Sequence, residues 1–183
     1  MKIIILLEPP YSIISLELEE IAQSQKFTYF SLSDVYPSET GSESDIAKTM
    51  KTYSSRQEAQ SYAYRAILKK HLKNPPKNGP NGFVLDPDCV ESPAEVAILL
   101  EVLTELGHPA PIVVDVQTSM EECMENVEDM SWDEEAAAEV STYFEGQYDA
   151  FLDCYKHKGL TIVEFDVEMD EKGLRKQFLT LLS

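Results

Sequence analysis

Apolar residues gather in five short runs, which are separated by longer segments of mixed polarity. The first run, IIILL, opens with three β-branched residues and is followed by Glu8 and two prolines. Short runs of this kind, bounded by turn residues, are typical of strands buried in a sheet. The sequence therefore predicts strands at 2–7, 27–30, 83–86, 111–116 and 160–166.

The segments between these runs carry helical signals. Ile14, Leu18 and Ile21 recur at helical spacing after Ser12, which is a candidate N-cap. Comparable spacing predicts helices at 12–25, 38–52, 56–73, 93–106, 118–130, 132–158 and 170–183. Because strands and helices alternate, the expected fold is a three-layer α/β/α architecture with a five-stranded parallel sheet. We expect a single domain over residues 1–183.

The net charge of the chain indicates which kinds of molecule it can bind. The chain has 33 acidic and 15 basic residues, a formal net charge of −18. Such a surface repels nucleic acid and anionic membranes, and it attracts a protein partner with a basic surface. No stretch approaches the length of a membrane span. Cys89, Cys123 and Cys154 lack metal-binding spacing, which favours free thiols in a reducing compartment such as the cytoplasm.

Several short segments, in order along nearly the whole chain, resemble the adenylate kinase family of nucleoside monophosphate kinases. They are IIILL with EEIAQ, FTYFSLSD, GSESDIAKTM, GFVLD, PIVVDV and TYFEGQYDAFLDCYKHKG. The resemblance implies a P-loop fold with a five-stranded parallel sheet. It also implies a helical insertion, at about 36–75, of the kind that binds the monophosphate, and a lid that is reduced near 128–133.

The residues that would perform the family's chemistry are missing. Where the family has its glycine-rich phosphate loop, this chain reads EPPYSIISL over 8–16, with Ile14 at the lysine position and Leu16 at the Mg²⁺-binding hydroxyl. A carboxylate at Glu8 would repel a phosphate about 4 Å away by roughly 4 kcal/mol. Pro37 and Val90 stand where the resemblance places arginines, which phosphoryl transfer requires to neutralise charge. We therefore expect no catalytic residue, no cofactor and no binding of ATP or AMP, and Glu8 or Tyr11 should fill the turn.

Asp86 and Asp115 stand at the ends of predicted strands, where ligands bind in α/β folds. Two carboxylates there could hold a metal ion. With few other ligands nearby, a helix cap or an inherited scaffold position is the favoured interpretation, and no metal site is assigned.

The acidic segment EECMENVEDMSWDEE over 121–135 has two interpretations. Its carboxylates could form an ordinary solvated helix face. Alternatively, apolar residues rimmed by carboxylates could form a docking patch for a basic protein. The residues proposed for that patch are Met124, Met130, Trp132, Glu121, Glu122 and Glu125.

Taken together, these patterns predict a catalytically inactive adenylate-kinase-like domain that serves as a structural or protein-interaction module. The alternative is an atypical nucleoside monophosphate kinase, or a protein that binds a nucleotide or nucleoside. The expected location is the cytoplasm. The resemblance to degenerate domains of ciliary and flagellar proteins adds a cilium or flagellum as an expectation.

Overall fold

The computed structural model describes residues 1–75, 80–129, 134–166 and 171–183. Five strands form one sheet in the order β2-β3-β1-β4-β5, and every neighbouring pair is parallel. The predicted five-stranded parallel sheet is therefore confirmed. The strands are β1 (Lys2–Leu7), β2 (Thr28–Phe30), β3 (Gly82–Leu85), β4 (Ile112–Gln117) and β5 (Thr161–Asp166).

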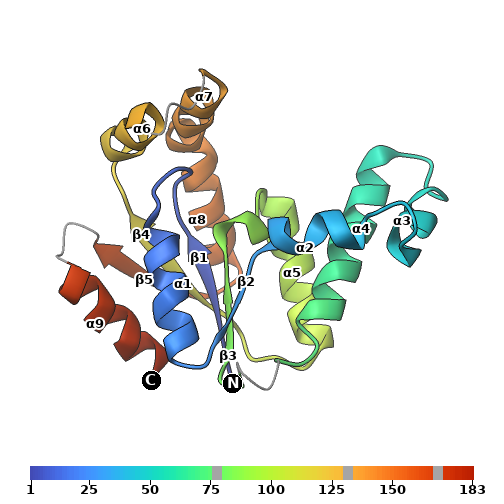
Figure 1. The fold of residues 1–183 in the computed structure, drawn as a ribbon, viewed down its shortest axis with the longest axis horizontal. Helices are drawn as coiled ribbons and strands as arrows, with labels where there is room; N and C mark the ends of the chain where they lie inside the picture. Colours follow the sequence, from blue (N-terminus) through green and yellow to red (C-terminus); the bar gives the residue numbers. More distant parts are fainter. Residues whose placement is uncertain (76–79, 130–133, 167–170) are drawn as a thin grey trace.

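Helices cover both faces of the sheet because the side chains of a strand alternate between the two faces. Ile4 and Leu6 of β1 pack with the helices α1 (Ile14–Ser24) and α9 (Glu171–Leu182). Ile3, Ile5 and Leu7 contribute to a second cluster on the opposite face. That cluster includes residues of α4 (Arg56–His71), α5 (Pro93–Glu105) and α8 (Tyr148–His157). Figure 1 shows α1 and α9 together on one side of the sheet.

The helix α2 (Leu32–Glu39) was not among the predicted helices, and the helix predicted over 38–52 is limited to Asp45–Met50. The helix α2 contains Pro37, which removes one backbone donor. Its beginning is held by a residue that is distant in sequence: the Asp88 carboxylate accepts hydrogen bonds from the amides of Leu32 (2.9 Å) and Ser33 (2.7 Å). The helix thus depends on a tertiary contact. The short 3₁₀ helix η1 (Pro87–Cys89), which supplies that carboxylate, was also not predicted.

The expected long helix over 132–158 is interrupted. The structure has α7 (Glu134–Thr142), a π-helical segment η2 (Tyr143–Gln147) and then α8. Gly146 has a φ of 153°, a conformation that residues with a side chain rarely adopt. The bend at this glycine changes the direction of the chain between α7 and α8.

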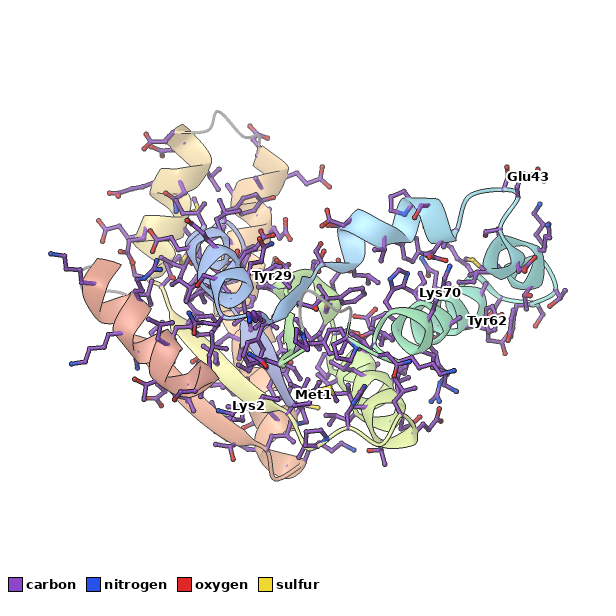
Figure 2. All side chains as sticks on the ribbon, turned by 60° about the horizontal axis from the view of Figure 1, so that its bottom comes forward. Met1, Lys2, Tyr29, Glu43, Tyr62 and Lys70 are labelled. Carbon is purple, nitrogen blue, oxygen red and sulfur yellow. The ribbon has the colours of Figure 1, made fainter. Side chains whose placement is uncertain are left out.

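Two groups of helices extend away from the sheet (Figure 1). One comprises α3 (Asp45–Met50) and the outer part of α4, on the side of β2. The other comprises α6 (Met120–Asp129) and α7, beyond the carboxyl ends of the strands. Figure 2 shows side chains that end in oxygen or nitrogen atoms along the helices that extend from the sheet. Among the described helices, none combines the length and apolar character needed to span a bilayer.

Candidate functional site

The buried polar residues of the described chain lie together at the carboxyl edge of the sheet. Glu8 and Ser12 follow β1, while Asp115 lies in the buried part of β4 near its carboxyl end and Thr118 follows the strand. β1 and β4 are neighbours in the sheet. Ligands of parallel α/β sheets bind at this edge, so the polar cluster marks the candidate site.

The turn after β1 keeps an unusual backbone. Tyr11 and Ile13 have φ values of 65° and 60°, in the left-handed region. This region is unfavourable for a residue with a side chain and most so for a β-branched one. The turn therefore adopts a conformation suited to glycine without having glycine there.

Glu8 fills this turn, as the sequence predicted that Glu8 or Tyr11 would. Its carboxylate accepts hydrogen bonds from the Ser15 amide, with N–O distances of 3.0 and 3.2 Å. Burial raises the pKa of Glu8, and hydrogen bonds from Ser12 and Ser15 partly offset this effect. The first amides of a helix form a natural anion site. In this protein the chain's own carboxylate occupies it.

Ser12 has a different role from the one expected. The N-cap of α1 is Ile13, which makes no side-chain cap, and the Ser12 hydroxyl lies 2.7 Å from the Thr118 hydroxyl. Ser12 therefore joins the loop after β1 to the end of β4. The carboxylate of Glu8 takes over the capping of α1.

A cleft of about 520 Å³ opens beside Glu8. We call it the central cleft. Four of its lining residues are acidic: Glu8, Asp88, Glu91 and Glu139. The remaining lining residues are Pro10, Pro87, Val90, Tyr143, Gln147 and Phe151.

A second pocket of about 560 Å³ shares Asp88 and Glu91 with the central cleft. It is lined further by Glu95 and by the apolar and aromatic side chains of α2 and α4, including Tyr36 and Tyr64. Neither pocket has a lysine, arginine or histidine among its described lining residues. The site is therefore negative throughout.

The three arginines of the chain lie elsewhere. Arg65 pairs with Glu101 and Glu105 of α5. Arg175 lies on α9, where it lines an open surface pocket, and Arg56 begins α4. None of the three lines the central cleft or the pocket beside it.

Three aspartates at this edge hold the local structure. Asp86 caps η1 through the Asp88 amide (3.0 Å) and accepts the Tyr29 hydroxyl (2.5 Å), and burial raises its pKa to about 6. Burial raises the pKa of Asp88 too, but hydrogen bonds from Ser33 and its neighbours bring that pKa below the usual value. Asp115 accepts from the Tyr148 hydroxyl (2.8 Å). The favoured cap interpretation fits Asp86, and the described residues contain no cluster suited to a metal ion.

In the central cleft, one hydroxyl lacks a hydrogen-bond partner and one carboxylate is surrounded by other negative charges. Tyr143 is 5% exposed, and its hydroxyl has no hydrogen-bond partner in the described structure. The pKa of Glu91 is raised by partial burial and then by the negative charges of Glu95, Asp88 and Glu139. The first observation shows a buried polar atom without a partner, and the second shows mutual repulsion among the carboxylates.

The predicted docking residues on α6 divide into two kinds. Glu121, Glu122 and Glu125 are all exposed, and Glu122 also accepts hydrogen bonds from the amide and the hydroxyl of Ser119, both at 2.9 Å. Met124 is half-buried against a small cluster between α6 and α7, made of Cys123, Val127, Ala136 and Val140. Met130 and Trp132 lie outside the described residues, as does most of the segment predicted to be a reduced lid.

A scan against protein-family models finds no match, and a search of curated proteins finds no significant relative. The role of the site therefore depends on its own chemistry. Sequence reasoning did not select Glu91, Glu139 or Tyr143. Glu139 and Tyr143 lie within the predicted helix 132–158, and Glu91 lies in the connection before α5. Neither helical periodicity nor a connecting segment indicates which residues face a cleft that forms between distant segments.

Proposed function

We propose that this chain is a catalytically inactive, adenylate-kinase-like α/β domain that binds a basic protein partner. One observation carries the proposal. The edge of the sheet where a nucleotide's phosphates would bind is lined by carboxylates, with no basic residue among its described lining. Phosphoryl transfer depends on positive groups that neutralise the transferred charge.

The geometry of the first turn supports the loss of phosphate binding. Glu8 uses the Ser15 amide, which would otherwise be free for an anion. The left-handed backbone at Tyr11 and Ile13 supports descent from a glycine-containing loop. Both features fit an ancestral nucleotide site whose chemistry has been replaced.

The acidic segment 118–145 is the proposed partner surface. Glu121 and Glu125 are exposed on α6, and Met120, which is 40% exposed, begins the same helix. Carboxylates around an exposed apolar side chain suit a basic partner whose association is accelerated by charge. A cytoplasmic or ciliary protein assembly is the setting that we propose.

Calorimetry with ATP, AMP and a bisubstrate dinucleotide, with and without Mg²⁺, tests the inactive assignment. We expect no binding tighter than millimolar. A micromolar signal that requires Mg²⁺ would favour the alternative of an atypical nucleotide-binding enzyme. Binding of a nucleoside without its phosphates would favour a nucleoside-binding role.

Titration with a lysine-rich peptide tests the partner surface. Replacing Glu121 and Glu125 by glutamine should weaken binding, and high salt should weaken it further. The matched control replaces Glu20 and Glu43, which are exposed elsewhere and carry the same charge. Equal loss in both variants would show that only net charge matters, and the α6 surface would be rejected.

A further inference from the structure

We propose that the central cleft binds a single ammonium or guanidinium group, supplied by a lysine or arginine side chain of the basic partner. This inference rests on the proposed function and assigns it a specific pocket. The pocket lies between the loop after β1, η1 and the α7–η2 segment. It is distinct from the exposed glutamates of α6.

The charge of the cleft requires compensation that the chain itself does not provide. Glu8, Asp88, Glu91 and Glu139 line it together, and no positive side chain is among its described lining. The pKa of Glu91 is raised first by partial burial and then by the charges of Glu95, Asp88 and Glu139, two of which also line the cleft. A cation held between these groups would replace repulsion by attraction.

The Tyr143 hydroxyl is an independent indication of a missing ligand. Tyr143 lines the cleft and is 5% exposed, yet its oxygen has no partner in the described structure. Its pKa is raised first by burial and also by the negative charges of Asp115 and Glu8, so the hydroxyl stays neutral. Buried polar groups are nearly always hydrogen-bonded, so one that is not requires an explanation. A neutral hydroxyl oxygen can accept an N–H from an ammonium or guanidinium group.

The remaining lining suits the stem of a long side chain. Pro10, Val90 and Phe151 provide apolar surface beside the carboxylates. Lysine and arginine place their methylene groups on apolar surface and their charged ends among polar groups. The cavity of about 520 Å³ is large enough for either side chain. The exposed glutamates of α6 would attract further basic residues of the same partner.

The test is a titration of the full chain with a capped peptide of alternating lysine and glycine, followed by NMR. We expect Tyr143→Phe to weaken binding at least about tenfold, because a hydrogen bond to a charged group is lost. Glu91→Gln should weaken binding by about fivefold. Glu20→Gln carries the same change of charge on the exposed face of α1 and should change binding by less than about twofold. Thermal melting of each variant confirms that it is folded.

The outcomes separate this inference from the proposed function. If Tyr143→Phe binds like wild type, or if Glu20→Gln is as harmful as Glu91→Gln, the cleft assignment is wrong. In that case, continued sensitivity to Glu121→Gln and Glu125→Gln would leave the proposed function in place. If spermidine binds as tightly as the peptide, with the same dependence on Tyr143, the ligand is a free polyamine and the assignment to a partner side chain is overturned.

Discussion

Replacing Glu8 by alanine should lower the stability of the fold much more than replacing it by glutamine, because alanine removes the hydrogen-bond acceptor and glutamine removes only the charge. Glu8 is 6% exposed, and its carboxylate accepts the Ser15 amide at 3.0 and 3.2 Å. Alanine removes the acceptor and leaves a helix N-terminus without its cap. Glutamine keeps an acceptor oxygen of nearly the same size but removes the buried charge.

The structure sets the size of each effect. A buried donor left without a partner costs about 1–3 kcal/mol, and loss of a helix cap costs about 1 kcal/mol. We therefore expect Glu8→Ala to lower the free energy of unfolding by roughly 2–4 kcal/mol. The free energy of unfolding of Glu8→Gln should lie within about 1 kcal/mol of the wild-type value at neutral pH. Glutamine loses the attraction between the charge and the helix dipole, but it also avoids the cost of burying a charge.

The pH dependence gives the sharper test. The pKa of Glu8 in the folded state is above its usual value of 4.5, chiefly because of burial. The contribution of Glu8 to the free energy of unfolding is therefore complete at a pH below its pKa in the unfolded chain. It declines as the pH rises through its pKa in the folded protein. Glutamine does not titrate, so Glu8→Gln should gain stability relative to wild type between pH 5 and about pH 8. Urea unfolding followed by circular dichroism at both pH values measures this difference. If the glutamine variant loses stability relative to wild type over that range, burial is not the dominant influence on Glu8.

Three further changes test other parts of the structure by the same unfolding measurement. Ile13→Gly should be about 2 kcal/mol more stable than Ile14→Gly, because glycine relieves the left-handed strain only at position 13. Tyr143→Phe should raise the free energy of unfolding by about 1 kcal/mol, since the lost hydroxyl has no partner; a decrease would reveal a bond that the structure does not show. Gly82→Ala should cost roughly 2–4 kcal/mol, because an added Cβ would lie 1.9 Å from the carbonyl oxygen of Lys2 and disrupt the pairing of β1 with β3; a smaller loss would mean that these strands can separate cheaply.

The fold was predictable wherever local sequence and tertiary environment agree. The buried strands are apolar runs with β-branched residues, and each was found within a few residues of its predicted place. The sequence did not predict α2, because the beginning of this helix is fixed by the Asp88 carboxylate, which is more than fifty positions away. The prediction of one helix over 132–158 failed at Gly146, since helical periodicity continues through a glycine whose backbone does not.

The site was only partly predictable for a related reason. Glu8 and its neighbours form a continuous loop, so a turn without glycine or lysine could be recognised from the order of its residues alone. The central cleft combines that loop with η1 and with side chains of α7 and η2. Glu91 and Glu139 resemble any other exposed glutamate in an acidic sequence. Only their place in the lining of one cleft, together with Glu8 and Asp88, distinguishes them.

The electrostatics of the carboxyl edge connect these observations to function. In a phosphate-binding loop, backbone amides face an anionic ligand that arrives from solution. Here Glu8 supplies the anion from within the chain, and the carboxylates around it make the cleft repel phosphates. Restoring only a lysine at Ile14 would leave Glu8, Asp88, Glu91 and Glu139 in place. Ile14→Lys alone should therefore not confer ATP binding, because the carboxylates that line the site suit a cation and not a phosphate.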